Sequence, residues 1–236
     1  MGSDTEQPAE TRGRPRLLAD NLILDAALSS FSDHGFDAMS LRSLNRDLGV
    51  SYGTVNQRFG SKEKLFYAAV DHGFSQLFAA VAELAAEEPS PSNGLETLRL
   101  QVRSFLRASI VRPELLRLMN REGLADTDRL DHIWTHHIEP RVRPLRLLLQ
   151  SLAEAGSIQP VSTRSFFFAL THGATAPYTL TALSSRFDEL DGPLDPTHHA
   201  QLMADLLVNG LAMAPDRWRE EAGGDYERPA PSRPSS

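Results

Sequence analysis

The two lysines of this chain, Lys62 and Lys64, lie within three residues of each other, although the chain has 24 lysines and arginines in all. Ser61 can accept a hydrogen bond from the first turn of a helix, so both lysines are expected at a helix N-terminus. Cations at that end oppose the helix dipole by roughly a few tenths of a kcal/mol each. An anion bound there reverses the sign of this cost. We therefore predict a phosphate contact for Lys62, whereas a solvated side chain offset by Glu63 is also consistent with Lys64.

The segment 52–58, just before the lysines, combines an apolar spacing with polar side chains. Val55 and Phe59 can point inward from one side of a short helix. The remaining side chains offer hydrogen-bond donors, acceptors and a stacking surface, which base edges and phosphates require. An ordinary polar surface helix is the alternative. The candidate nucleic-acid contacts here are Ser51, Tyr52, Gly53, Thr54, Asn56, Gln57 and Arg58.

Further candidate contacts lie upstream. The sequence RGRPR at residues 12–16 is basic, and its glycine and proline favour an extended arm. Arginine is the preferred cation in a narrow minor groove, so Arg14 and Arg16 are candidates, with a solubilising tail as the alternative. Ser40 can cap a short helix that begins at residue 41, and we add Ser40 and Arg42 to the candidate contacts.

Histidines raise the question of a metal site. His132 and His136 lie four residues apart, with His137 beside them and His172 further along the chain. No carboxylate or thiolate motif completes the set, so we expect no metal and no other cofactor. Hydrogen bonding within a pocket, or a solvated face, explains these residues better. The candidate lining of an apolar pocket is Phe105, Met119, Trp134, His137, Phe168 and His172, although aromatic residues at helical spacing more often belong to a core.

Helices must position these residues, because strand patterns are almost absent. Apolar spacing and Gly35 predict a first helix at 17–34, and Pro140 and Pro144 predict a kink or break in a later one. We expect an all-α chain of about nine helices, at 17–34, 41–48, 52–58, 62–88, 95–109, from Pro113, 127–155, 162–187 and 197–214.

The second and third of these helices are joined by a tight turn at 49–51 and follow a longer amphipathic helix, an arrangement typical of a helix-turn-helix. Isolated helices this short are marginal in water. They must therefore pack on the first helix, through Leu41, Leu44, Leu48, Val50, Val55 and Phe59.

Composition limits the class of protein. A chain of 236 residues with 41% hydrophobic content can bury a substantial core, and the absence of cysteine excludes disulfides and thiolate metal sites. No apolar run approaches the roughly 20 residues that span a bilayer, and the acidic N-terminus is unlike a signal peptide. We expect a cytoplasmic protein with no membrane association. The net charge is −7, yet residues 11–64 are mildly basic, which favours a DNA-facing part joined to an acidic remainder.

The stretch ILDAALSSFSDHGFDAMSLRSLNRDLGVSYGTVNQRFGSKEKLF, residues 23–66, resembles the DNA-binding region of the tetracycline-repressor (TetR) family of transcriptional regulators. The matching features are A-A-x-x-x-F, G-F-x-x-x-S, G-V-S-x-G-T and F-x-S-K-E-x-L at consistent spacing. Two residues depart from the family pattern. Asn56 replaces a usual tyrosine and Asn45 a usual alanine, so Asn45 should find a partner or turn outward.

The resemblance implies an organisation and a mechanism. It divides the chain into a basic arm at 1–16, a helix-turn-helix domain at 17–64, a ligand-binding and dimerisation domain at 65–214, and a disordered tail at 215–236. A homodimer formed by the last two helices would bind a palindromic double-stranded DNA operator, with its reading helices about 34–36 Å apart. A largely apolar small molecule would release it, so a repressor is expected.

Two alternatives remain. A helical small-molecule-binding protein or enzyme could carry a vestigial helix-turn-helix, but no Ser/His/Asp, Cys/His or HExxH arrangement supports an enzyme. The fold could also persist with operator binding lost, with Asn56 as the suspect.

Overall fold

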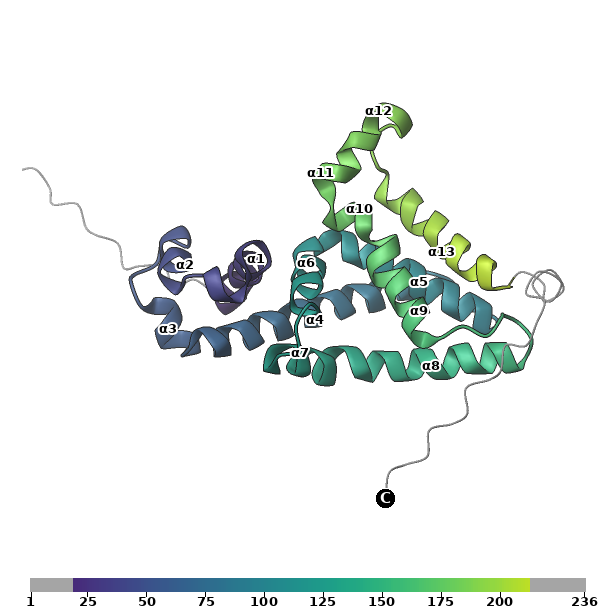
Figure 1. Cartoon of the computed structure of the whole chain (residues 1–236), viewed down its shortest axis with the longest axis horizontal. Coiled ribbons are helices and arrows are strands. Elements are labelled where there is room, and N and C mark those ends of the chain that lie inside the picture. The colour runs from purple at the N-terminus through teal and green to yellow at the C-terminus, as the bar shows by residue number, and fades with distance from the viewer. Residues whose placement is uncertain (1–18, 213–236) are drawn as a thin grey trace, which may run out of the picture.

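The computed structural model describes residues 19–212, and this part of the chain is helical with no strand (Figure 1). The arm at 1–16 with Arg14 and Arg16, and the tail at 215–236, lie outside the described residues. The α-helices are α1 (Asp20–Ala38), α2 (Leu41–Asp47), α3 (Thr54–Phe59), α4 (Lys62–Ala86), α5 (Gly94–Val111), α6 (Pro113–Glu122), α7 (Asp128–Ile133), α8 (Glu139–Glu154), α9 (Thr163–Phe168), α10 (Ala176–Thr179), α11 (Thr181–Ser184), α12 (Asp188–Asp191) and α13 (Pro196–Ala212). The all-α prediction is confirmed.

The predicted helix ends are mostly confirmed by their caps. The Ser40 and Ser61 side chains accept hydrogen bonds from the backbone N–H groups of Ser43 and Lys64, at 3.5 and 3.2 Å. Pro113 opens α6, where its missing N–H costs nothing. Gly35 interrupts α1 with φ 80° and ψ 167°, so the helix breaks at the predicted glycine and then continues to Ala38.

The third helix differs from its prediction. We expected residues 52–58, whereas α3 covers Thr54–Phe59 and Gly53 precedes it with φ 88°. Gly53 adopts this left-handed conformation readily because it has no Cβ. The Ser51 hydroxyl lies 2.7 Å from the Thr54 hydroxyl, and Gly53, at the cap position, has no side chain with which to cap α3. Tyr52 and Gly53 therefore belong to the turn, and Tyr52 projects before the helix begins.

A first core cluster joins the helix-turn-helix to the following helices. It contains Phe31 of α1, Val55 of α3 and Phe66 of α4, all fully buried. Residues of α6 and α7 complete it, including Leu115, Leu118 and Ile133. Because α4 contributes Leu65, Phe66, Ala69, Val70, Phe74 and Leu77 along one face, this long helix connects the N-terminal helices to the rest of the molecule (Figure 1).

A second core cluster lies toward the other end of α5. Its main contributors are α5, α8, α9 and α13, with Leu98, Leu149, Phe166 and Ala204 among the buried side chains. The small residues Ala200, Ala204 and Val208 of α13 are fully buried, which allows α13 to lie close against α5. The predicted last helix is confirmed. Its residue Leu206 is 56% exposed.

The predicted helix at 127–155 is present but contains a π-helical turn, Trp134–Ile138, between α7 and α8. We predicted a kink or break at Pro140 and Pro144. Pro144 lies inside α8, and the irregularity instead precedes Pro140, where the Glu139 N–H bonds to the Trp134 carbonyl five residues back. Proline lacks an N–H and its ring crowds the carbonyl four residues before it, so a wider turn ahead of Pro140 relieves this conflict.

The prediction of one continuous helix at 162–187 is wrong. After α9 the chain forms a π-helical turn, Ala169–Ala174, and then the short helices α10 and α11. Pro177 cannot donate a backbone hydrogen bond, and Leu180 leaves the helical region with φ −101° and ψ 51°. The hydroxyl groups of Thr171 and Thr175 donate to carbonyls four residues earlier, which competes with regular helix geometry.

In the described part of the chain, no helix combines the length and the apolar character that crossing a membrane requires.

Candidate nucleic-acid interface and effector region

The face of α3 that points away from the core is polar and accessible. Tyr52 is 85% exposed, and Asn56 and Gln57 are exposed on the helix that follows it. Val55, between them, is fully buried in the first core cluster. The structure therefore presents a phenol and two carboxamides on one surface, which can stack on and hydrogen-bond to base edges or phosphates.

Three other predicted contacts have structural tasks near this surface. Ser51 and Thr54 bond to each other, and Ser40 caps α2. Arg42 is exposed on α2, and so is Arg46, which the sequence did not single out. Arg46 donates to the Ser43 hydroxyl at 2.7 Å and pairs with Asp47 at 3.3 Å, both within its own helix.

Arg58 forms an ion pair with Asp20 at the first residue of α1. The pair links α3 to α1, because the two residues belong to different helices of the helix-turn-helix. The Arg58 side chain is one-quarter exposed, so it lies at the edge of the α3 surface. Asp20 was absent from the sequence-based candidates because no local pattern connects it to Arg58.

Lys62 has intramolecular partners. Its Nζ donates to the Asp37 carbonyl at 2.9 Å and lies 4.9 Å from the centroid of the Phe36 ring. This carbonyl belongs to the last turn of α1, where a cation interacts favourably with the helix dipole. The contact accounts for a lysine at an otherwise unfavourable position, and it leaves the exposed Lys64 as the more accessible of the two cations.

Asn45 fastens α2 to α3. Its side-chain amide donates to the Leu41 carbonyl at 2.6 Å, and its Oδ1 accepts from the Val55 N–H at 3.1 Å. The residue is buried away from water, and these two hydrogen bonds satisfy both ends of its amide. Gly53 supplies no side-chain cap to α3, and Asn45 takes over that task from the neighbouring helix. The expectation that Asn45 finds a partner is confirmed.

The candidate pocket residues do not converge on one place. Phe105 and Met119 pack against the core, whereas Trp134 and Phe168 are 46% and 52% exposed. Phe168 and His172 are the pair brought together, with ring centroids 4.8 Å apart. Partial burial lowers the pKa of His172 below that of a free imidazole.

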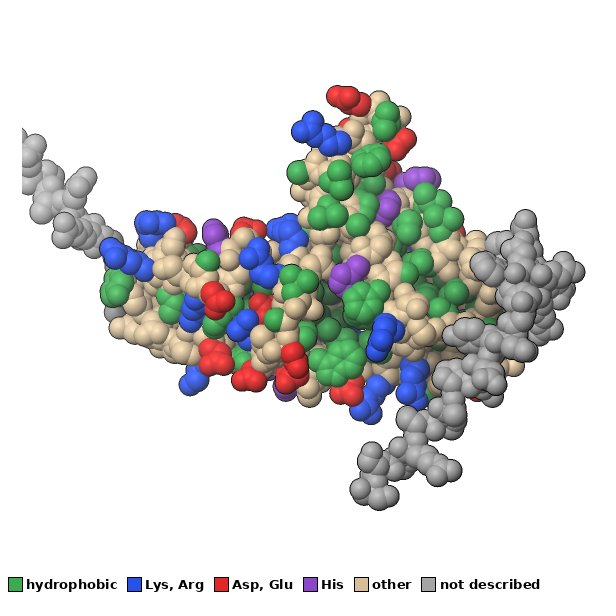
Figure 2. Space-filling model, viewed as in Figure 1, with side chains coloured by type: hydrophobic (Ala, Val, Ile, Leu, Met, Phe, Trp, Pro, Cys, Tyr) green, Lys and Arg blue, Asp and Glu red, His purple; other side chains and the backbone are tan. Residues whose placement is uncertain are grey.

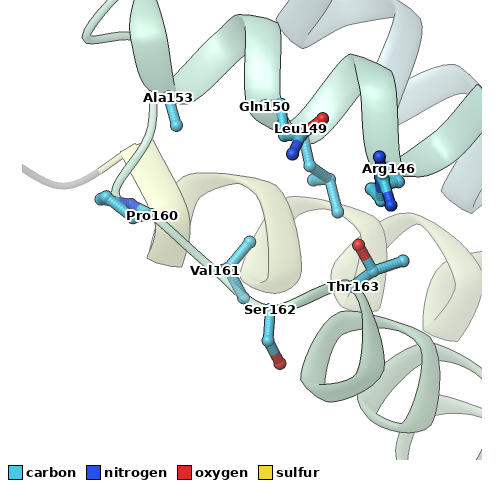
Figure 3. Close-up of a pocket in the computed structure, with 8 residues that line it drawn as sticks. All are labelled: Arg146, Leu149, Gln150, Ala153, Pro160, Val161, Ser162 and Thr163. Atoms are coloured by element: carbon cyan, nitrogen blue, oxygen red, sulfur yellow. The ribbon is translucent and has the colours of Figure 1, made fainter. Parts of the chain in front are cut away.

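A cavity of about 240 Å³ lies between α8 and the segment that leads into α9 (Figure 3). Its lining mixes polar and apolar groups and includes none of the candidate pocket residues. The side chains that line it are Arg146, Leu149, Gln150, Ala153, Pro160, Val161, Ser162 and Thr163.

His137 instead packs against α4. Its ring stacks on Phe74 with centroids 4.4 Å apart, and its Nε2 lies 2.6 Å from Asp71 Oδ1. Burial lowers the pKa of His137, although Asp71 acts in the opposite direction. His132 Nε2 lies 2.7 Å from the same oxygen. A carboxylate from α4 thus meets two histidines of a later segment, which the sequence analysis did not anticipate.

Large apolar side chains are exposed over the C-terminal helices, where Figure 2 shows hydrophobic groups gathered above the centre of the molecule. The set comes from α11 to α13 and the residues that flank them, and no described element covers it. Its members are Leu180, Leu183, Phe187, Leu190, Leu194, Leu202 and Leu206. Exposed large apolar side chains that gather in one region are typical of a protein contact.

Comparison with known proteins supports this description at two levels. The sequence profile of "Bacterial regulatory proteins, tetR family" matches residues 23–69, which cover most of α1, all of α2 and α3, and the start of α4. The HTH-type transcriptional repressor ComR of Escherichia coli (strain K12) is 36% identical over 98 residues, 40% of this chain and 46% of ComR. The chain thus spans less than half the length of that relative.

The remaining chain is matched mainly through its fold. The HTH-type transcriptional regulator RutR of Escherichia coli (strain K12) is 27% identical over 148 residues, 63% of this chain and 68% of RutR. The structure of the ketosteroid transcriptional regulator KstR2 of Mycobacterium tuberculosis superposes with a TM-score of 0.60 at 18% identity, covering 84% of this chain and 97% of KstR2. Residues 23–69 thus match the sequence profile of the tetR family, and the described part of the chain shares the fold of KstR2.

Proposed function

We propose that the chain is a DNA-binding transcriptional regulator that acts as a homodimer and is released from its operator by a small molecule. The observation that carries the proposal is the exposed polar surface formed by Tyr52 in the turn and by Asn56 and Gln57 on α3, whose other face is buried. A helix presented in this way fits the major groove, while exposed cations such as Arg42 and Lys64 can reach phosphates. The names of the matched relatives, repressors and regulators, agree with this proposal.

In this proposal residues 17–64 bind DNA and residues 65–214 bind the effector and dimerise. The exposed leucines of α11 to α13 are offered as the surface that meets a second copy, because a symmetric contact there covers apolar groups that one chain leaves exposed. Light scattering should then give twice the chain mass of 26.1 kDa. For the effector, Phe168 and His172 supply an exposed aromatic pair.

The first experiment is a gel shift with DNA that flanks the protein's own gene, repeated at several salt concentrations. We expect a complex that survives excess nonspecific competitor and weakens steeply with salt, because lysine and arginine contacts to phosphate release counterions. If the operator lies elsewhere in the genome, selection of bound sequences from random DNA should identify it. Failure of both experiments to give a sequence-specific complex would contradict the proposal and favour a ligand-binding protein of the same fold.

Arg58→Ala is expected to lower operator affinity about tenfold, or about 1.4 kcal/mol. The reason is a phosphate contact at the edge of the α3 surface. Asp20→Ala removes one carboxylate that pairs with Arg58 and keeps the Arg58 guanidinium on the α3 surface, so it should leave affinity unchanged or higher. Dissociation constants from fluorescence anisotropy, with circular dichroism as a check of folding, make the comparison.

Glu139→Ala is the matched control for charge. Glu139 lies on α8 and pairs with Arg143, so its removal changes net charge as Asp20→Ala does, without touching the helix-turn-helix. An equal loss of affinity in Arg58→Ala and Asp20→Ala would show that the pair only holds α3 on α1. The DNA-contact assignment of Arg58 would then be wrong.

A further inference from the structure

We propose that Asp71, His132 and His137 form a binding site for one divalent transition-metal ion of the zinc type. The three side chains offer one carboxylate oxygen and two imidazole nitrogens, and these ligand atoms all lie within 4.8 Å of one another. The carboxylate comes from α4 and the imidazoles from the segment 132–137, so the site joins two parts of the fold.

The π-helical turn is what brings the two imidazoles together. His132 and His137 are five residues apart, a spacing that places two side chains on different faces of a regular α-helix. The turn Trp134–Ile138 has one extra residue per turn, with the Glu139 N–H bonded to the Trp134 carbonyl. Both Nε2 atoms consequently reach the same Asp71 oxygen, at 2.7 and 2.6 Å. Turns of this kind occur frequently at functional sites.

Aromatic side chains of α4 hold both rings in place. The His137 ring lies parallel to Phe74, at an angle of 7°. The His132 ring lies 4.5 Å from the Tyr67 ring, one turn earlier on α4. Tyr67, Asp71 and Phe74 share one face of α4 because they are spaced by four and three residues. The imidazoles are thus oriented toward the carboxylate before any ion binds.

The ligand set selects the class of metal. Two imidazoles and one carboxylate suit zinc and its first-row neighbours, whereas magnesium and calcium prefer oxygen ligands. Tetrahedral ligand atoms that lie 2.0–2.1 Å from zinc are about 3.3 Å apart. The distance from each Nε2 to Asp71 Oδ1 would therefore increase by about 0.6 Å when zinc binds. His132 and His137 side chains are 20% and 13% exposed, while Asp71 is 49% exposed. Solvent can therefore supply the fourth ligand from the Asp71 side.

The test is metal titration of the full, untagged chain. Zn²⁺ affinity is measured by competition with a chromogenic chelator, and Co²⁺ reports geometry through its visible d–d bands. We expect one ion per chain. Loss of an outer partner of a metal ligand already lowers affinity about 10–100-fold, so His137→Gln and Asp71→Asn should each lower it at least tenfold. His198→Gln removes an exposed histidine of α13 and should leave binding unchanged.

A second variant keeps the test decisive if those substitutions disturb folding. Asp71→Cys retains three ligands and places a thiolate on the ion, so Co²⁺ should show a sulfur-to-metal charge-transfer band in the near ultraviolet. Wild-type affinity no tighter than that of His137→Gln, or a folded Asp71→Cys protein without the band, would overturn the site. The three residues would then be a hydrogen-bonded cluster only.

Discussion

Phe66→Ala is expected to lower the free energy of unfolding by about 3–5 kcal/mol, the cost of removing a fully buried phenyl group. Phe66 lies where α1 and α4 meet, with ring centroids 5.1 Å from Phe31 and 5.6 Å from Phe36. Both contacts are edge-to-face, an arrangement that adds about 0.5–1.5 kcal/mol per pair beyond area burial. Urea unfolding followed by circular dichroism measures the change.

Tyr52→Ala is the control for Phe66→Ala, because it removes an aromatic ring that is 85% exposed. It should leave the unfolding free energy within about 0.5 kcal/mol of the wild-type value. It should also lower operator affinity if the α3 surface binds DNA. Equal stability of the Phe66→Ala and wild-type proteins would show that α1 and α4 are not joined by this cluster.

Gly35→Ala is expected to lower the free energy of unfolding by at least about 1–3 kcal/mol, from backbone strain alone. Gly35 has φ 80° and ψ 167°, a region that is accessible essentially to glycine only. An alanine Cβ would also lie 2.7 Å from Arg121 Nη1. Arg121 donates a hydrogen bond to the Asp33 carbonyl at 3.3 Å. Displacing the Arg121 side chain would break this bond and loosen α6 from the end of α1. The same urea experiment measures this effect.

Gly192→Ala separates the two causes. Gly192 has nearly the same backbone conformation as Gly35, with φ 79° and ψ 173°, but an added Cβ meets nothing within 4 Å. Its substitution should cost about 1–3 kcal/mol, the cost of backbone strain without a clash. A loss in Gly35→Ala that does not exceed the loss in Gly192→Ala would contradict the role of Arg121.

The helix-turn-helix could be predicted from sequence because its determinants are local. Apolar residues at helical spacing, such as Ile23, Ala27 and Phe31, are buried in the first core cluster, as expected. Serine caps and Pro113 fixed several helix ends in the same way. The C-terminal segments were harder, since neither π-helical turn has a recognised pattern in residue type or spacing.

The candidate sites show the same difference between features set by local sequence and features set by the packing of distant helices. The exposed residues of α3 follow from the inward positions of Val55 and Phe59, because helical geometry fixes the opposite face. Partners such as Asp20 for Arg58, or Asp71 for His137, depend on how distant helices pack. Aromatic residues were ambiguous for another reason. Trp134 and Phe168 carry the same local pattern as core residues, and only the absence of a covering helix in the described part of the chain leaves them exposed.

The π-helical turn before Pro140 also sets the angular phase of α8. Successive side chains of an α-helix are about 100° apart, so one extra residue in a turn rotates every later side chain by about that angle. Leu149 and Leu152 are buried in the second core cluster with this rotation in place. Loss of one residue from 134–138 would turn them toward solvent and bring their polar neighbours inward. At this position the number of residues, as well as their chemistry, is part of what the fold requires.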